Sequence, residues 1–252
     1  MALALVTGAS SGVGRATVLA LRARGWEVLA VARRAAHLDE LATDCAAAIH
    51  PLDAADPKAV DALLQSLGGR TPDLIVNAAG AGRWHRLEDT SPAEARAMMD
   101  APFFAAFLIT RAFLPGMLAR GSGQIIHVNS PAAYQPWPHS ALYAASRGAL
   151  RSLHEALRQD LAGSGVISSH ITFGKVSSDY FAANPGTEER LPKIARTFRT
   201  LSPEDCAALI LRLIDRPRAE AVHPPLMAFY LTVWRLWPSL VRWIIRITSP
   251  RP

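Results

Sequence analysis

Apolar runs of strand length alternate along the chain with longer segments of helical periodicity. The runs are rich in valine, isoleucine, leucine and alanine, and they predict strands over residues 4–7, 27–32, 48–52, 74–77, 124–129 and 166–173. The helical segments cover residues 15–24, 35–47 and 58–67, and two longer ones lie near residues 92–119 and 139–162. This strict alternation predicts an α/β fold, a doubly wound parallel sheet covered by helices on both faces.

Two predicted helices have a recognisable start. Ser91-Pro-Ala-Glu94 places an N-cap, a first-turn proline and a capping-box glutamate in order, and Ser202-Pro-Glu-Asp205 repeats most of this pattern. We therefore expect helices to begin directly after both serines. In such a parallel sheet, ligands bind at the carboxyl ends of the strands, so the turns that follow the strands are the first candidates for chemistry.

The composition is that of one domain with a large core. The chain has 252 residues, of which 50% are hydrophobic and 19% charged, and no linker-like stretch or internal repeat divides it. The N-terminal residues lead straight into a glycine-rich turn, which favours a first strand over a signal peptide. Cys45 and Cys206 are far apart and lack metal-ligand spacing, so we expect no metal site and a reducing, cytoplasmic location.

The turn after the first predicted strand reads Thr7-Gly-Ala-Ser-Ser-Gly12-Val-Gly14 and opens the first helix. Gly8 suits a tight turn, Gly12 lets the backbone approach a pyrophosphate, and Gly14 allows helix and strand to pack closely. The helix N-terminus adds N–H groups and a partial positive charge. An ordinary tight turn is the alternative, but the strand–turn–helix context favours a dinucleotide cofactor on a Rossmann-type fold.

The end of the second predicted strand indicates which dinucleotide binds. An acidic residue there would bind the ribose 2′-hydroxyl, whereas the chain has Arg33 and Arg34 and no acid before Asp39. Two guanidinium groups suit a 2′-phosphate, so we expect NADP(H), with a solvated basic turn as the alternative. The formal net charge of +6 agrees with an anionic ligand, while the dispersed arginines argue against nucleic acid.

Three further segments extend the pattern. Asn77-Ala-Ala-Gly80 follows the fourth strand, Ser130 closes the fifth, and Tyr143 comes thirteen residues later, with Arg147 one helical turn beyond it. Together with the glycine-rich turn, these residues resemble the short-chain dehydrogenase/reductase family over roughly residues 1–225. The resemblance implies cofactor contacts at Gly8, Ser10, Ser11, Gly12, Val13, Arg33, Arg34, Asp53, Asn77, Ala78, Gly80, Tyr143, Arg147, Gly174, Val176 and Ser178.

Two of these positions have a simple structural alternative. Asp53 matches the family position that binds the adenine amine, but an aspartate in a turn also caps helices. Ser178 ends Phe173-Gly174-Lys-Val176-Ser-Ser178, which resembles the family segment that contacts the nicotinamide amide, and it too could be a helix cap.

The resemblance also implies catalytic roles. Ser130 would orient and polarise the substrate oxygen, and Tyr143 would transfer the proton. Arg147 would hold the nicotinamide ribose and favour the phenolate of Tyr143, but the family has lysine here, and arginine is wider and gives up a proton poorly. Pro102 stands where an ungapped alignment expects a catalytic asparagine, and a proline inside a helix predicts a kink.

The last part of the chain contains the expected lid and an apolar tail. Residues from about 179 to 200 are the expected substrate lid, and Tyr180, Phe181 and Phe198 suggest a partly apolar pocket. Residues 226–252 form a tail rich in leucine, isoleucine and tryptophan, with arginines that argue against a membrane-spanning helix. We expect this tail to pack on the domain, on a partner subunit or against a membrane surface, with a protein contact slightly favoured.

The sequence therefore predicts an NADP(H)-dependent oxidoreductase that transfers hydride between the nicotinamide and a carbonyl or alcohol group of an apolar small molecule. The alternative is a non-catalytic NADP(H)-binding sensor or structural protein. The departures at Pro102 and Arg147 support the alternative, and the retained Ser130 and Tyr143 oppose it. We expect a cytoplasmic homo-oligomer without a nucleic-acid partner, whose tail could add a peripheral membrane contact.

Overall fold

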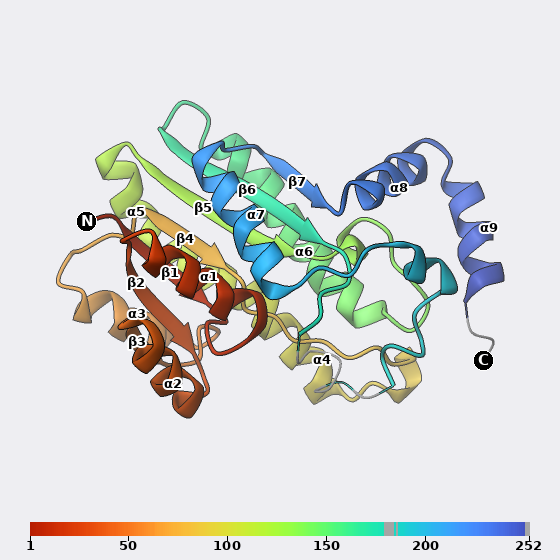
Figure 1. Ribbon diagram of the computed structural model, residues 1–252, viewed down its shortest axis with the longest axis horizontal. Coiled ribbons are helices and arrows are strands. Elements are labelled where there is room, and N and C mark those ends of the chain that lie inside the picture. Colours follow the sequence, from red (N-terminus) through yellow and green to blue (C-terminus); the bar gives the residue numbers. More distant parts are fainter. Residues whose placement is uncertain (179–183, 185, 250–252) are drawn as a thin grey trace.

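The computed structural model describes residues 1–178, 184 and 186–249, and within them seven parallel strands form one sheet (Figure 1). The strand order is β3-β2-β1-β4-β5-β6-β7. The order reverses beside β1, and in doubly wound sheets ligands bind at the carboxyl ends of the strands around this point. The strands are β1 (Leu3–Thr7), β2 (Glu27–Ala32), β3 (Ala48–Pro51), β4 (Leu74–Asn77), β5 (Gly123–Asn129), β6 (Val166–Phe173) and β7 (Glu220–His223).

Helices cover both faces of the sheet and enclose two apolar cores. On one face, α1, α2 and α7 pack on the strands through buried residues such as Val18 and Ile210, and on the other face α3, α5 and α6 do so through residues such as Phe113 and Leu157. The doubly wound α/β fold is thus confirmed. The helices are α1 (Gly12–Ala23), α2 (Ala35–Cys45), α3 (Pro57–Ser66), α4 (Pro92–Met99), α5 (Ala105–Arg120), α6 (Ala141–Asp160), α7 (Pro203–Asp215), α8 (Pro225–Leu236) and α9 (Pro238–Thr248), with short 3₁₀ helices at Leu87–Asp89, Pro131–Ala133 and Lys193–Thr197.

The six predicted strands are all present, and their ends differ from the prediction by at most one residue. Ser91 and Ser202 both form the predicted capping boxes at the starts of α4 and α7. The sequence pattern did not predict β7 (Glu220–His223). This strand has four half-buried residues, which include a glutamate and a histidine, and it lacks an apolar run. It forms a strand because it pairs with β6.

The predicted helix near residues 92–119 is interrupted in its middle. A π-helical turn over Asp100–Phe104 separates α4 from α5, and Pro102 lies buried in it. Proline cannot donate a backbone hydrogen bond, and the N–H of Ala105 donates to the carbonyl of Asp100, five residues back. The departure from α-helical geometry that Pro102 predicts is therefore present.

The described stretch Pro92–Arg120 is long and apolar enough to cross a membrane, judged by length and composition alone. It comprises α4, the π-helical turn and α5. Phe113 and Met117 of α5 are fully buried against the sheet. Because core helices of globular proteins have the same composition, we interpret this stretch as a core element.

The tail forms two helices, α8 and α9, beyond the carboxyl end of β7 (Figure 1). One face of each helix packs on the domain, around Phe198 from the segment that precedes α7. The opposite face of each helix is exposed. The buried residues of this small cluster are Phe198, Met227, Tyr230, Leu231, Val241 and Ile245.

Candidate active site

A cavity of about 640 Å³ opens at the carboxyl ends of the strands, beside the point where the strand order reverses. It is bounded by the glycine-rich turn after β1, the ends of β2, β4, β5 and β6, and the first turns of α6. Of the predicted site residues, all but Asn77 line it: Gly8, Ser10, Ser11, Gly12, Val13, Arg33, Arg34, Asp53, Ala78, Gly80, Ser130, Tyr143, Arg147, Gly174, Val176 and Ser178.

Asn77 lies beneath the cavity floor and does not line it. Its side chain is buried, and Nδ2 lies 3.2 Å from Oγ1 of Thr110 and 3.3 Å from Nδ1 of His127. Phe198, from the predicted lid, does line the cavity, whereas Tyr180 and Phe181 lie outside the described residues. The lid therefore stays a prediction.

The glycine-rich turn has the geometry that its sequence predicts. Gly8 and Gly12 have φ angles of +69° and +52°, which favour glycine. A Cβ at Gly14 would lie within 3 Å of the Gly8 carbonyl, so only glycine lets the helix pack this closely on the turn. The side chain of Thr7 ties the turn to β4, because its Oγ1 accepts hydrogen bonds of 3.1 Å from the N–H groups of Ala78 and Ala79.

The N-terminus of α1 points into this turn with its backbone donors available. Ser11 is the N-cap residue, and its side chain makes no capping hydrogen bond within the described structure. No acidic residue occupies the first turn of α1. The partial positive charge of the helix end is therefore free to act on an anion, as in phosphate-binding turns.

Arg34 holds its guanidinium group over the glycine-rich turn. Its Nη2 donates to Oγ of Ser10 at 2.9 Å and to Oγ of Ser11 at 2.6 Å. Arg33 is mostly exposed, and its Nη1 lies 4.0 Å from Oδ2 of Asp53. Asp53 also accepts a hydrogen bond of 3.0 Å from the N–H of Ala55, but the N-cap of α3 is Asp56, so Asp53 does not cap this helix.

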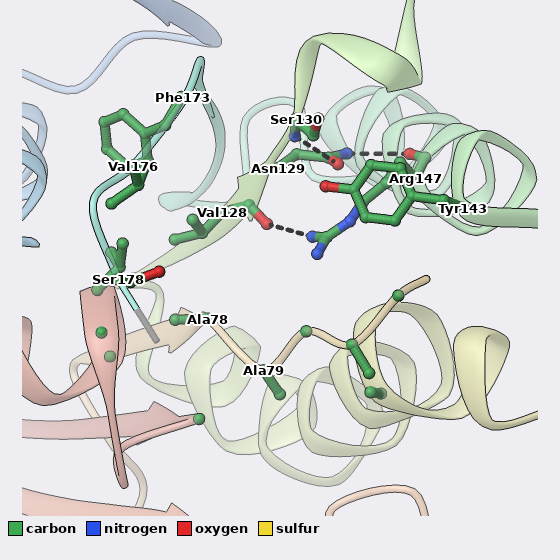
Figure 2. A pocket seen from close by; sticks show the side chains of 18 of the residues that line it. Ala78, Ala79, Val128, Asn129, Ser130, Tyr143, Arg147, Phe173, Val176 and Ser178 are labelled. Atoms are coloured by element: carbon green, nitrogen blue, oxygen red, sulfur yellow. Dashed lines mark hydrogen bonds between the residues drawn. The ribbon is translucent and has the colours of Figure 1, made fainter. Parts of the chain in front are cut away.

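Tyr143 and Arg147 lie one turn apart on α6 and share one wall of the cavity (Figure 2). The guanidinium carbon of Arg147 is 5.1 Å from the centre of the Tyr143 ring. Gly80 and Gly82 make room for these side chains, since a Cβ at either glycine would lie within 3 Å of Arg147 or Tyr143.

Arg147 is a buried cation with few partners. Its side chain is 9% exposed, and Nη1 donates one long hydrogen bond of 3.4 Å to the carbonyl of Val128. In the described part of the chain its Nε has no hydrogen-bond partner, and no carboxylate forms an ion pair with it. A buried guanidinium that faces a cavity and lacks an ion-pair partner among the described residues fits a ligand rich in oxygen atoms.

Ser130 ends β5 and is held by the residue before it. The N–H of Ser130 donates to Oδ1 of Asn129 at 2.8 Å, and Nδ2 of Asn129 donates to the carbonyl of Arg147 at 2.9 Å (Figure 2). The second N–H of Asn129 points to Nε2 of His170, 2.8 Å away. Asn129 thus joins the serine, the helix that carries Tyr143 and Arg147, and β6.

This hydrogen-bonded network continues to the surface. Nδ1 of His170 lies 3.3 Å from the hydroxyl of Tyr134, which donates to Glu220 at 3.0 Å. Burial and the neighbouring Glu220 raise the pKa of Tyr134 to about 12, so this phenol keeps its proton. A neutral His170 with its proton on Nδ1 satisfies every donor and acceptor in the chain from Asn129 to Glu220.

Three histidines are fully buried behind Ser130. The rings of His127 and His154 are 6.1 Å apart, and those of His154 and His170 stack at 5.3 Å. Burial, with smaller contributions from neighbouring positive groups, lowers their pKa values to about 3, 4 and 2, respectively. The described residues contain no group of histidine, cysteine or acidic side chains arranged to hold a metal ion.

Sequence reasoning missed Asn129, His170 and the two tryptophans beside Tyr143. His127 and Asn129 in β5 and His170 in β6 were the available signal, because parallel strands buried on both faces are normally apolar. Trp84 lies 5.9 Å from the ring of Tyr143 and 6.0 Å from that of Trp137. Both tryptophans line the cavity, and with Leu191, Phe198 and Met227 they make one side of it apolar.

The chain is similar to known dehydrogenases over most of its length. Residues 2–189 match the model of the short chain dehydrogenase family. The chain is 33% identical to a probable NADP-dependent dehydrogenase of Haemophilus influenzae, over 85% of this chain and 88% of the relative. It is 32% identical to an uncharacterised short-chain type dehydrogenase/reductase of Sinorhizobium fredii, over 85% and 86% of the two chains.

Solved structures of dehydrogenases superpose on this chain over most of its length. A short-chain dehydrogenase from Streptomyces avermitilis superposes with a TM-score of 0.82 at 27% identity, over 96% of both chains. A serine dehydrogenase complexed with NADP+ superposes with a TM-score of 0.80 at 27% identity, over 87% of this chain and 93% of that one. The protein therefore belongs to the short-chain dehydrogenase family and is an oxidoreductase.

Proposed function

We propose that the protein uses NADP(H) to transfer hydride between the nicotinamide and a carbonyl or alcohol group of an apolar substrate. The observation that carries this proposal is the meeting of Ser130, Tyr143 and Arg147 in one cavity with the glycine-rich turn. The tryptophan-lined wall beside Tyr143 supports an apolar substrate.

The residues of the cavity fit NADP(H) on chemical grounds. The backbone of the glycine-rich turn and the uncapped N-terminus of α1 suit the pyrophosphate. The Arg34 guanidinium with the Ser10 and Ser11 hydroxyls, joined by Arg33, suits a 2′-phosphate. The Arg147 guanidinium group, which lines the cavity, suits the hydroxyls of the nicotinamide ribose.

Each side chain of the site has one role in the proposed reaction. The bound cofactor supplies or accepts the hydride. The Tyr143 hydroxyl gives a proton to the substrate oxygen in reduction and takes it back in oxidation, and the charge of Arg147 favours the phenolate that this leaves. Ser130 hydrogen-bonds the substrate oxygen and stabilises the negative charge that develops there. Asn129 positions Ser130 through its N–H.

The coenzyme preference tests this proposal. The wild-type protein should oxidise NADPH in the presence of apolar aldehydes, ketones or quinones, and prefer it to NADH. The substitution Arg34→Ser should raise the dissociation constant for NADPH by about 10- to 100-fold, because it removes charge-assisted hydrogen bonds to a phosphate. The dissociation constant for NADH should stay nearly unchanged. Titration of protein fluorescence with each nucleotide measures both constants.

The matched control for Arg34 is Arg15→Ser. Arg15 lies on α1, pairs with Asp44 and does not line the cavity, so its replacement should leave both constants unchanged. Equal loss of NADPH and NADH affinity in Arg34→Ser would contradict the role assigned to Arg34. NADPH binding without turnover of any carbonyl in a broad panel would contradict the proposed reaction.

Two departures from the family pattern belong to this proposal, arginine at 147 for the catalytic lysine and Pro102 for the catalytic asparagine. Pro102 itself does not line the cavity, whereas Asp100 and Ala101 of the π-helical turn do. We infer that the turn is kept while the asparagine side chain is lost. The segment from about residue 179 to 200 is proposed as the substrate lid, within an NADP-binding domain of residues 1–225.

Arginine at position 147 should slow proton transfer. An ammonium group is smaller than a guanidinium and exchanges its proton readily. Arg147→Lys should therefore raise kcat severalfold with little change in the dissociation constant for NADPH. Steady-state kinetics and fluorescence titration check this, with Arg158→Lys, an exposed arginine on the same helix, as control. An unchanged or lower kcat would mean that the cavity is adapted to arginine.

A further inference from the structure

The tail carries an exposed apolar surface on each of its two helices. On α8, Leu226, Phe229 and Leu236 follow one another at helical spacing, and on α9 Leu240, Trp243 and Ile247 do the same. Trp237 lies in the turn between the helices. We call these seven side chains the tail surface; their exposed fractions range from 46% for Leu240 to 66% for Phe229.

The charged side chains of the tail itself all have one sign. Residues 224–249, all of which the structure describes, contain three arginines and no aspartate or glutamate. Arg235, Arg242 and Arg246 are exposed, and Arg242 and Arg246 lie one turn apart on α9, beside the apolar stripe. Arg242 also stacks at 5.3 Å on Trp234 of α8, which fixes one cationic group between the two helices.

A second copy of the chain is a poor match for this surface. Most two-fold contacts bring the same patch of both subunits together. Such a contact would gather the arginines of both tails around the apolar residues, and this segment has no carboxylate to pair with them. Like charges placed together in this way oppose association.

An anionic lipid bilayer matches both features of the surface. Tryptophans concentrate at the membrane interface, and arginines beside an apolar stripe pair with lipid phosphates. α8 and α9 have 12 and 11 residues, too few to span a bilayer, for which about 20 are needed. Helices of this length and pattern lie in the plane of the interface.

We propose that α8 and α9 bind the surface of anionic membranes, with the tail surface inserted among the lipid headgroups and the three arginines on their phosphates. Met227 of α8 lines the active-site cavity, so binding would place the cavity close to the bilayer. The binding does not require catalysis, and the NADP(H) proposal stands or falls separately from it.

Co-sedimentation of the full-length protein with lipid vesicles tests this proposal. The protein should bind vesicles of phosphatidylcholine mixed with phosphatidylglycerol, bind pure phosphatidylcholine vesicles much less, and dissociate at high salt. Leu240→Ser combined with Trp243→Ser should abolish binding. The matched control is Leu118→Ser combined with Ile167→Ser, two exposed apolar residues on α5 and β6, which should bind like the wild type.

The arginines have a test of their own. Arg235→Gln combined with Arg246→Gln should lower the partition coefficient onto anionic vesicles about 30-fold, because the free energies of two arginine contacts with anionic lipid are lost together. Arg216→Gln combined with Arg218→Gln, two exposed arginines before β7, should have little effect. Circular dichroism shows whether each variant is folded. If Leu240→Ser/Trp243→Ser fails this check, Trp243→Ser alone replaces it, and if Arg235→Gln/Arg246→Gln fails it, Arg246→Gln alone replaces it.

Three results would overturn the proposal. Equal binding to neutral and anionic vesicles would remove the role of the arginines, and binding that survives in Leu240→Ser/Trp243→Ser would remove that of the tail surface. Absence of vesicle binding, together with a dimer that this double variant dissociates in analytical ultracentrifugation, would assign the surface to a second copy of the chain.

Discussion

Tyr143→Phe should lower kcat for carbonyl reduction by about 10²- to 10⁴-fold, the usual contribution of a positioned acid or base. The substitution removes only the hydroxyl that exchanges the proton. The ring should keep its packing against Trp84, 5.9 Å away, and its contact with Arg147. NADPH affinity should therefore change little, and the loss should appear in the chemical step.

NADPH oxidation followed by absorbance measures this effect, and fluorescence titration confirms that the variant still binds the nucleotide. Tyr230→Phe is the matched control, because Tyr230 is a buried tyrosine whose hydroxyl donates to Gln135 and which does not line the cavity. A Tyr143→Phe enzyme that keeps most of its turnover would show that another group transfers the proton.

The free energy of unfolding should fall steeply as the pH drops below 6.5. His127, His154 and His170 are fully buried, and their pKa values are lowered to about 3, 4 and 2. In the unfolded chain the same groups titrate near 6.5. The unfolded state therefore binds more protons below this pH, and the native state loses stability. Each histidine should cost about 2 kcal/mol by pH 5, or about 6 kcal/mol together, which is comparable to the whole stability of many domains.

Urea unfolding at several pH values between 5 and 7.5 measures this dependence. His127→Asn should reduce the pH dependence of the free energy of unfolding by about one third, because one of the three histidines is removed. His37→Asn should leave it unchanged, because His37 is exposed and solvated in both states. A stability that is constant from pH 7 to pH 5 would show that the three rings are not buried in neutral form.

The same histidines connect stability to the site. His170 lies in the chain of hydrogen bonds that begins at Ser130 and passes through Asn129 and Tyr134 to Glu220. A protonated His170 could not accept the hydrogen bond from Asn129. Because the pKa of His170 in the folded protein is lowered to about 2, this hydrogen bond should persist at every pH at which the protein stays folded, and acid should disrupt the positioning of Ser130 only through unfolding.

The local order of elements could be predicted from the sequence because it depends on neighbouring residues. The six apolar strands, the serine caps at Ser91 and Ser202 and the interruption at Pro102 each arise from patterns within a few residues. The glycine-rich turn could be recognised for the same reason. Gly8 has a positive φ and lies against the backbone of Ala78 and Ala79, and Gly14 lies against the Gly8 carbonyl, so both positions require glycine and the motif carries its own geometry.

Features that depend on distant residues could not be predicted in this way. β7 is a strand because β6 offers it hydrogen-bond partners, and its own residues do not form an apolar run. Asn77 was assigned to the cofactor by its place in a motif, but the packing turns its side chain toward Thr110 and His127 below the cavity. Trp84 meets Tyr143 although 59 residues separate them in the chain.

The fold class and the position of the glycine-rich turn follow from local patterns of residue types, and the resemblance to the short-chain dehydrogenase family indicated Ser130, Tyr143 and Arg147 as the candidate chemistry. The surroundings of these groups follow from tertiary packing. Burial placed the Arg147 guanidinium at the cavity with no carboxylate partner among the described residues, lowered the pKa values of three histidines, and exposed one apolar face of each tail helix. These properties depend on solvent access and on contacts between segments far apart in the chain, which appear only once the chain has folded.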